Sequence, residues 1–168
     1  MAATSASNLR PNVCAVLTDA ERRRVLVFRR VDRALGEQRW QFPQGGLEPR
    51  EAPEAALLRE LREEIGTDDV EVLARLPQPI AYRFPPEILA ALRRRDPDKA
   101  GFAGQAQHWF LVRLRGGTAR IHFDHQPAEF DAYEWVEPAE AVERVVAFKR
   151  AAYREALTAL GLLDGRTS

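Results

Sequence analysis

The segment from Trp40 to Gly66, WQFPQGGLEPREAPEAALLRELREEIG, constrains the fold more than any other part of the chain. A glycine pair leads into a stretch in which Pro53 suits the first turn of a helix and Gly66 is placed to end it. Between them, apolar residues recur at helical spacing, which predicts one buried face on this helix. That stripe consists of Leu57, Leu58, Leu61 and Ile65.

Three acids of the same helix, Glu60, Glu63 and Glu64, follow the spacing i, i+3 and i+4. At about 100° per residue they point from one helix face and repel each other unless a positive charge lies among them. Hard carboxylate oxygens are the ligands that Mg²⁺ and Mn²⁺ prefer. The alternative is a solvent-facing acidic helix whose Glu and Arg side chains pair with each other. The carboxylate cluster points to an enzyme that acts on phosphates through a divalent metal.

The length of 168 residues fits one domain with a real core. The 25 basic residues balance the 25 acidic ones, so no overall field draws the chain to nucleic acid or a membrane. Cys14, the single cysteine, excludes an intrachain disulfide, suits a reducing cytoplasm and is expected to be a small buried hydrophobe. We expect a disordered tail over 1–9, one domain over 10–161, and a C-terminal tail over 162–168, with no secretion signal or membrane span.

The order of the remaining elements predicts an α+β fold, an α/β/α sandwich. Two strands joined by a polar turn predict a hairpin near the N-terminus. A short helix is expected to open at Pro85–Pro86 and to end in a solvated charge run, Arg93–Lys99. The last helix is expected to run from Pro138 to Gly161. The predicted strands are Asn12–Thr18, Arg24–Arg30, Val70–Leu76, Gln107–Leu114, Thr118–Phe123 and Tyr133–Val136.

The order glycine, five residues, glutamate, seven residues, Arg-Glu-Leu-x-Glu-Glu-x-Gly runs from Gly45 through Glu51 to Arg59–Gly66. It resembles the Nudix box, the loop–helix–loop signature of hydrolases that cleave nucleoside diphosphates linked to another group. Only Thr67 departs from it, where an apolar residue is usual, and this residue lies at the helix exit rather than among the expected ligands. The resemblance implies a Nudix-type α/β/α sandwich with a mixed β-sheet and a catalytic loop–helix–loop.

The resemblance also implies roles for the residues of the box. Glu60 and Glu64 would be the principal ligands of Mg²⁺ or Mn²⁺, with more than one ion bound, and Glu63 would share a metal or a water. Gly45 would lend a backbone carbonyl, and Arg59 would pair with Glu51 to hold the loop against the helix.

A wider resemblance runs from about Arg10 to Leu157, through LRPNV, WQFPQGG, GQAQHWFL, EFD and VAFKR. These motifs are similar to the Nudix branch of bacterial RNA pyrophosphohydrolases and of the dinucleoside tetraphosphate hydrolases of bacteria and plants. The resemblance implies that Glu129 is a further metal ligand or the general base, and that Arg10 and Lys149 bind substrate phosphates.

Four more residues have two interpretations each. Phe148 would stack on a base or belong to the core with Val145 and Ala152. Tyr82 would line the same pocket or simply pack, and Gln44 and Gln105 would bind substrate or cap loops.

The substrate remains open between two kinds of 5′-polyphosphate. One is the 5′ end of triphosphate or diphosphate RNA, trimmed to a monophosphate, and the other is a dinucleoside polyphosphate. Free nucleoside triphosphates are a further alternative, and a non-catalytic nucleotide- or RNA-binding module is a remote one. The long loop Val31–Arg39, with Arg39 in place of a small hydroxyl residue, departs from the RNA-acting members, and YRFPP resembles the plant hydrolases. We expect a nucleotide or RNA as partner, neither DNA nor a membrane, and leave the oligomeric state open.

Other chemistries have weak support in the sequence. His122 and His125 flank Asp124, but their spacing in a short strand and turn is poor for tetrahedral metal geometry. The patterns GxxxxGK[ST] and GxGxxG are absent, which argues against a P-loop kinase and a dinucleotide oxidoreductase.

Overall fold

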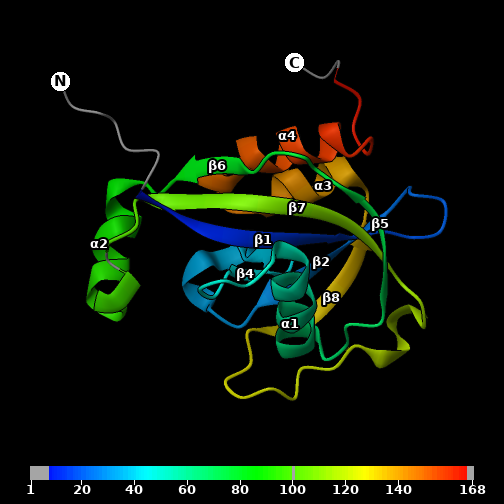
Figure 1. The fold of residues 1–168 in the computed structure, drawn as a ribbon, viewed down its shortest axis with the longest axis horizontal. Helices are drawn as coiled ribbons and strands as arrows, with labels where there is room; N and C mark the ends of the chain where they lie inside the picture. The colour runs from blue at the N-terminus through cyan, green and yellow to red at the C-terminus, as the bar shows by residue number, and fades with distance from the viewer. Residues whose placement is uncertain (1–7, 100, 166–168) are drawn as a thin grey trace.

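The computed structural model describes residues 8–99 and 101–165, and its centre is a mixed sheet (Figure 1). The long strands β1 (Leu9–Leu17) and β7 (Gly104–Leu114) pair in parallel at the middle of this sheet. The strands β4 (Gln44–Gly46), β5 (Val70–Arg75) and β6 (Ile80–Arg83) pair antiparallel with them. This arrangement places the glycine pair of β4 directly beside β1.

A second, antiparallel sheet has the order β3 (Trp40–Gln41), β2 (Val25–Arg30) and β8 (Phe130–Val136). The predicted N-terminal hairpin is therefore wrong. β1 and β2 belong to different sheets and share only an isolated bridge between Thr18 and Val25. Both strands have runs of buried residues, so each packs inside the molecule between covering layers, where a two-stranded hairpin would leave one face in water.

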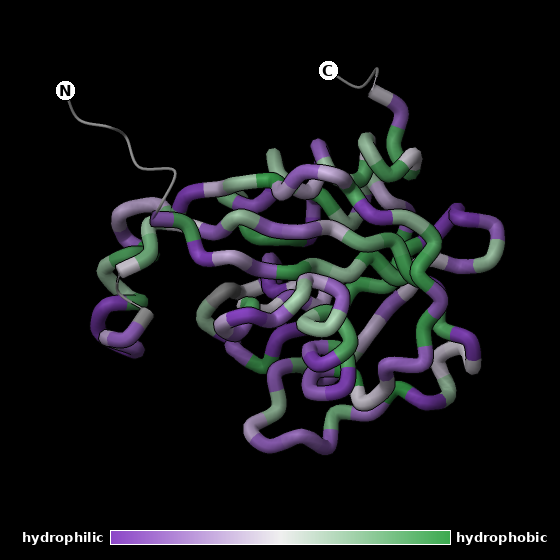
Figure 2. Tube along the Cα trace, viewed as in Figure 1, coloured by the Kyte–Doolittle hydropathy of each residue, from purple (hydrophilic) through white to green (hydrophobic). Residues whose placement is uncertain are grey.

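Helices cover the two sides of this β-structure, as an α/β/α sandwich requires (Figure 1). The helix α1 (Pro53–Ile65) lies on one side, and α3 (Pro138–Arg144) and α4 (Arg150–Ala159) lie on the other. Alternate residues of β1 point to opposite sides, so Val16 belongs to the buried cluster that includes Tyr153 of α4, whereas Leu17 belongs to the cluster that includes Leu61 of α1. Figure 2 shows the hydrophobic residues concentrated along the central strands and the hydrophilic ones in the outer loops.

The helix α1 has the ends that the sequence predicts. Pro53 is its first residue, and Gly66 ends it with φ 80°, a left-handed conformation that favours glycine. Leu57, Leu61 and Ile65 are buried, and Leu58 is half-buried against the same cluster. Thr67 is buried as well, and its hydroxyl accepts a hydrogen bond from the backbone N–H of Asp69 at 3.2 Å, which gives the polar side chain a partner.

Two of the other predicted elements differ from the structure, and one strand was not predicted. The last helix is not continuous, because Val145 has extended dihedral angles (φ −84°, ψ 156°) that separate α3 from a short 3₁₀ helix, η5 (Ala147–Lys149), and from α4. Instead of a strand over Thr118–Phe123, the chain forms the 3₁₀ helix η4 (Gly117–Arg120) followed by irregular backbone. The strand β6 was not predicted, since its short stretch carries little alternation.

The helix α2 (Pro86–Arg95) forms where Pro85–Pro86 predicts it, and stands at one end of the sheet (Figure 1). The charge run that follows it is the solvated helix end and the 3₁₀ helix η3 (Pro97–Lys99), as expected. The loop between β2 and β3 contains another 3₁₀ helix, η2 (Arg33–Gln38).

The domain extends slightly beyond the predicted limits at both ends. Leu9 begins β1, and Leu162 and Leu163 pack against the core beside α4. The rest of the expected tails, residues 1–7 and 166–168, lies outside the described residues. Within the described ranges, no helix has the length and apolar character needed to cross a bilayer.

We expect Tyr153→Phe to lower the free energy of unfolding by about 1–3 kcal/mol, the typical result of leaving a buried donor unsatisfied. The Tyr153 hydroxyl accepts the backbone N–H of Phe42 at 2.9 Å inside the core, and phenylalanine cannot replace that acceptor. Urea denaturation measures the change. The matched control is Tyr133→Phe, at a ring that is 39% exposed. Equal stability of both variants and the wild type would contradict the prediction.

Candidate active site

The glycine pair of β4 allows two charged side chains to approach the backbone. A Cβ on Gly45 would overlap the carboxyl group of Glu60, and a Cβ on Gly46 would overlap the guanidinium of Arg10. Any larger residue at either position would have to displace one of these side chains. The two glycines therefore allow Glu60 of α1 and Arg10 of β1 to lie close to the same short strand.

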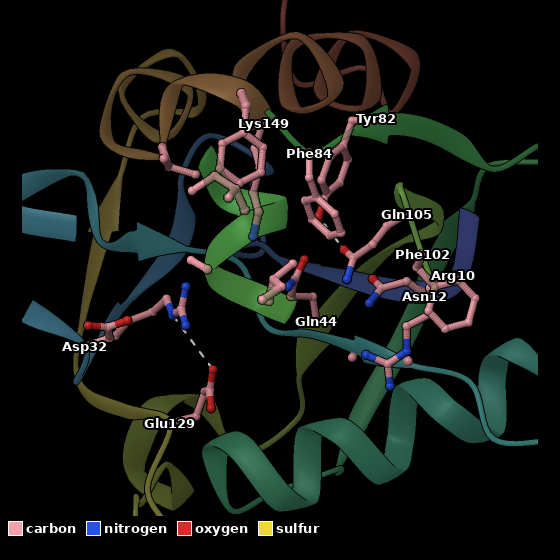
Figure 3. A pocket seen from close by; sticks show the side chains of 18 of the residues that line it. Arg10, Asn12, Asp32, Gln44, Tyr82, Phe84, Phe102, Gln105, Glu129 and Lys149 are labelled. Atoms are coloured by element: carbon pink, nitrogen blue, oxygen red, sulfur yellow. Dashed lines mark hydrogen bonds and ion pairs between the residues drawn. The ribbon is translucent and has the colours of Figure 1, made fainter. Parts of the chain in front are cut away.

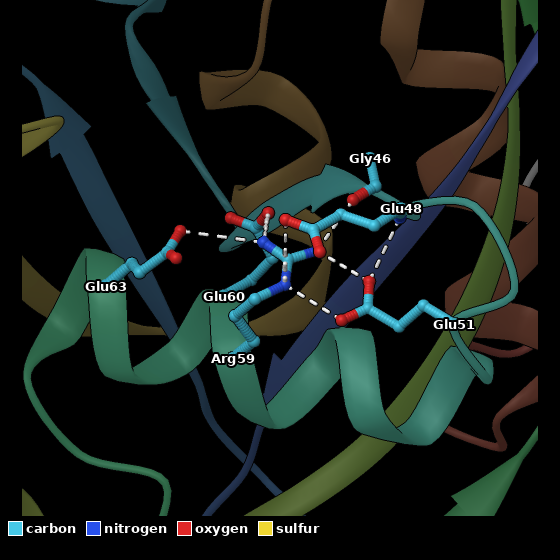
Figure 4. Close-up of polar contacts among 6 residues, drawn as sticks. All are labelled: Gly46, Glu48, Glu51, Arg59, Glu60 and Glu63. Carbon is cyan, nitrogen blue, oxygen red and sulfur yellow. Dashed lines mark hydrogen bonds and ion pairs between the residues drawn. The ribbon is translucent and has the colours of Figure 1, made fainter.

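Arg59 connects the loop to α1, as the sequence predicts (Figure 4). Its Nε and Nη2 donate to the two carboxylate oxygens of Glu51 at 2.9 and 2.7 Å, a bidentate pair. Nη2 also donates to the carbonyl of Gly46 at 2.9 Å, and Nη1 donates to Glu60 at 2.8 Å. Glu63 lies farther away, at 3.6 Å from Nη1. Arg59 thus holds the glycine strand, the loop and the acidic helix in one arrangement.

The carboxyl groups of Glu60 and Glu64 are neighbours in a place where water is scarce. Burial is the main cause that raises the pKa of Glu64 well above its usual value, and the charges of Glu60 and Glu129 raise it further. Burial also raises the pKa of Glu60, against the opposing effect of Arg59. The Oε2 atom of Glu64 is buried and has no hydrogen-bond partner. An orphaned oxygen between repelling acids is a place that a cation would stabilise.

A divalent cation fits these residues, with Glu60 and Glu64 as the groups that would hold it. Glu63 is 43% exposed and Glu129 is 50% exposed, so both remain free to turn toward a bound ion. In the part of the chain that the structure describes, no three acidic, histidine or cysteine side chains already form a metal site. The remaining ligands would be water and substrate oxygens, which Mg²⁺ commonly keeps.

A cavity of about 400 Å³ opens beside these acids (Figure 3). All of the substrate-binding residues that the sequence suggests line it, together with Gly45, Glu60, Glu64 and Glu129. Three of the predicted residues, Glu51, Arg59 and Glu63, do not line it. Arg59 and Glu51 pair with each other and hold the loop against α1, and Glu63 is 43% exposed and lies 3.6 Å from Arg59. The substrate-binding candidates along the wall are Arg10, Gln44, Tyr82, Gln105, Phe148 and Lys149.

Lys149 is a buried cation at the inner wall of this cavity. The break between α3 and α4 turns it inward, where its Nζ donates to Gln41 at 3.4 Å and lies 6.0 Å from the ring centre of Tyr82. Burial and then the charge of Arg30 lower the pKa of Lys149 to about 8. A buried ammonium group with such weak partners is suited to receive an anionic ligand.

The aromatic and amide residues of the cavity form two groups. Tyr82, Phe84 and Phe148 pack as a three-ring cluster, with ring centres 5.9 to 6.1 Å apart, so Phe148 combines its two proposed positions, half-buried on the core and facing the cavity. The Tyr82 hydroxyl donates to the side-chain carbonyl of Gln105. The amide of Gln107 donates to Gln44 at 2.8 Å.

The structure adds residues that the sequence argument missed. The Gln107 amide also donates to Asn12 at 2.9 Å, and the Nδ2 of Asn12 is left without a partner beside the cavity. Arg30 lines the cavity next to Glu129, with 3.8 Å between their charged atoms. The last residue of a strand before a loop is a common position for ligand contacts, and Arg30 could have been found by this signal.

Arg39 and the two histidines lie outside the cavity. Arg39 faces a separate hollow beside Trp40 and Arg144, so its difference from a small hydroxyl residue changes the outer surface and not the cavity wall. His122 lies over Gly66 at the end of α1, and its Nδ1 is 3.2 Å from Oδ2 of Asp124. Cys14 is buried, and burial raises its thiol pKa far above the usual value.

Comparison with known proteins agrees with this geometry. A model of the NUDIX domain matches residues 8–159. The chain belongs to the Nudix family. This Nudix protein is therefore a hydrolase that acts on phosphoric anhydride bonds.

Curated relatives align with this Nudix chain over most of its length. An RNA pyrophosphohydrolase of Saccharophagus degradans is 44% identical over 158 residues, which cover 92% of the chain and 87% of the relative. An RNA pyrophosphohydrolase of Helicobacter pylori is 39% identical over 151 residues, which cover 88% and 90%.

Solved structures share the Nudix fold at lower identity. The E. coli dihydroneopterin triphosphate pyrophosphohydrolase superposes with a TM-score of 0.65 at 20% identity, covering 89% of this chain and 98% of that one. An Ap4A hydrolase binary complex from C. elegans gives a TM-score of 0.60 at 15% identity, covering 91% and 98%. These likenesses confirm the predicted sandwich.

We expect Glu51→Gln to reduce the acid sensitivity of this Nudix protein. Hydrogen bonds from Arg59 are the main cause that lowers the pKa of Glu51 from 4.5 to about 2. A depressed folded-state pKa gives stability that is present above pH 4.5 and is lost as pH falls toward 2. Melting temperatures measured across this pH range should fall more steeply with decreasing pH in the wild type than in the variant. Glu54→Gln, an exposed acid of the same helix, is the control, and parallel curves for all three proteins would refute the pairing as a source of stability.

We expect Glu64→Gln to separate metal binding from folding. Without divalent ions the variant should be at least as stable as the wild type, because the neutral amide removes repulsion from Glu60 and Glu129. Added Mg²⁺ should raise the melting temperature of the wild type and leave that of the variant unchanged. At a Mg²⁺ concentration of 100 times Kd, binding stabilises the folded wild type by about 2.7 kcal/mol. An equal Mg²⁺ shift in both proteins would exclude Glu64 as a ligand.

Proposed function

We propose that this protein is a metal-dependent RNA pyrophosphohydrolase, which removes phosphates from the 5′-polyphosphate end of RNA and leaves a 5′-monophosphate. The observation that carries the proposal is the arrangement of the cavity, where buried acids and cationic side chains face each other across one space. The names of the relatives support RNA as the substrate. The single buried thiol is compatible with a cytoplasmic location.

The residues divide the work between charge and position. Arg10 and Lys149 bind the phosphate chain, since both line the cavity and neither has an ion-pair partner among the described residues. A divalent cation held by Glu60 and Glu64, with Gly45 and Glu63 as further ligands, would supply Lewis-acid chemistry and make water more acidic near the anhydride. Glu129 takes up the proton of the attacking water, or completes the cation site, because its exposed carboxylate stands at the mouth.

Positioning accounts for the rest of the mechanism. Arg59 and Glu51 hold α1 so that its acids do not move when phosphate charge enters, which is preorganisation of the electrostatic environment. Gln44 and Gln105 offer amide groups along the wall, and Phe148 presents a ring face that can stack on a base at about 1–3 kcal/mol per base. A polyphosphate chain, a ribose and a base can thus be bound in one cavity.

A dinucleoside polyphosphate is the second candidate substrate, since it presents the same chain of phosphates on a nucleoside. The observation that favours it is the apolar part of the cavity wall, formed by Phe84 of YRFPP and by the helix that follows it. Hydrolysis of 5′-triphosphate RNA, diadenosine tetraphosphate and ATP in parallel, with every product identified, decides between these substrates.

We expect Glu64→Gln to lower kcat on 5′-triphosphate RNA by at least about 100-fold, because even partners of metal ligands typically contribute 10–100-fold. The control is Glu54→Gln, which removes an exposed acid from the same helix and should retain the kcat of the wild type. Release of pyrophosphate or phosphate, measured in Mg²⁺ and then in Mn²⁺, gives both rates. A Glu64→Gln protein that turns over like the wild type would show that the reaction takes place elsewhere.

A further inference from the structure

The helix α2 turns an apolar side toward the catalytic cavity. Ile88, Ala91 and Leu92 line the cavity, whereas Leu89 and Ala90 of the same helix do not. The three lining residues follow i, i+3 and i+4, so they form one face of the helix. None of the residues of α2 is buried, which is unusual for the apolar face of an amphipathic helix.

This face does not contribute to the core. In the described part of the chain, the two buried clusters and the side chains packed on them include no residue of α2. Apolar surface left half-exposed in a cavity is removed from water when a ligand covers it. The arrangement therefore points to an apolar ligand group at this wall, beyond the charged end where phosphates bind.

The ring cluster lines the same cavity. Phe84 and Phe148 meet edge to face, with ring centres 6.1 Å apart, and both half-buried residues line the cavity. Figure 3 shows Phe84 beside Tyr82 at the cavity. The space between the ring cluster and the aliphatic side chains of α2 fits a flat ligand group. Such a group would be apolar on both faces and joined to phosphates. A nucleobase has these properties.

A weak ion pair holds the end of α2 across the cavity mouth. Nη1 of Arg95 lies 3.7 Å from Oδ2 of Asp32, which belongs to the loop before η2, and both residues line the cavity. The Arg95 side chain is 69% exposed, so water screens the pair and its opening costs little. The pair links the last residue of α2 to Asp32, so a substitution of Arg95 tests whether the position of α2 matters for binding.

We propose that the apolar face of α2, formed by Ile88, Ala91 and Leu92, binds a nucleobase of the substrate against the ring cluster, with the Arg95–Asp32 pair positioning the helix. The proposal rests on the proposed function, since it assumes a 5′-polyphosphate joined to nucleosides. It makes α2 a recognition element for the nucleoside part, separate from the residues that bind phosphate.

The first test compares Leu92→Ser with Leu89→Ser, the same change at two half-buried leucines of α2. Leu92→Ser should raise KM for 5′-triphosphate RNA about fivefold or more, the effect of weakening a stacking contact of about 1 kcal/mol, with kcat nearly unchanged. Leu89→Ser should match the wild type. Inhibition by inorganic tripolyphosphate, which has no base, should be equal in all three proteins.

Abasic substrates identify the base that is bound. A series of 5′-triphosphate RNAs, each abasic at one of the first three nucleotides, should contain one member for which Leu92→Ser and the wild type have the same KM. The second test compares Arg95→Ala with Arg94→Ala, its unpaired neighbour on the described helix. Arg95→Ala should raise KM for RNA, leave tripolyphosphate inhibition unchanged and lose the discrimination between intact and abasic RNA.

Calorimetric binding of the same ligands keeps the two proposals apart. A wild type that binds these RNAs but releases no phosphate overturns the proposed function, and the binding constants of the Leu92→Ser and Leu89→Ser proteins still decide the role of α2. The α2 proposal is overturned if Leu92→Ser and Leu89→Ser change the binding of RNA equally. It is also overturned if Leu92→Ser weakens the binding of tripolyphosphate as much as that of RNA.

Discussion

The site depends on one guanidinium. Arg59 binds Glu51 through two hydrogen bonds, the carbonyl of Gly46 through a third and Glu60 through a fourth. Its side chain is 19% exposed, so these contacts form where water competes weakly. Arginine suits the position because its planar fork can satisfy several acceptors at once, which a lysine cannot do. This one side chain therefore links the glycine strand, the loop and the acidic helix.

The same arrangement buries charged groups without close partners of opposite charge, and bound metal and substrate would supply such partners. Glu64 is buried next to Glu60, and the buried Lys149 lines the same cavity. Each would be more stable in water or beside a close partner of opposite charge. Local rules for stability are commonly broken at functional sites, and the rest of the fold compensates for them. Here the rigid sandwich supplies that compensation through its two cores, one on each side of the sheets.

The sequence best predicts structural features that depend on residues close to each other along the chain. The limits of α1, its apolar stripe and the Arg59–Glu51 pair follow from local spacing. The errors arise where distant segments decide: β1 and β2 separate because each finds other partners, and Val145 breaks the last helix so that Lys149 can face inward. The role of α2 depends on its place at the cavity edge, which no spacing within Pro86–Arg95 reveals.

Anomalous diffraction from crystals soaked in Mn²⁺ tests the central claim, that the buried pair of acids on α1 is a cation site. The account predicts a manganese peak bonded to Glu60 and Glu64, beside the backbone of Gly45, with water or phosphate completing the coordination. Absence of a peak there at saturating Mn²⁺, or a single strong peak at another cluster such as His122 and Asp124, would contradict it.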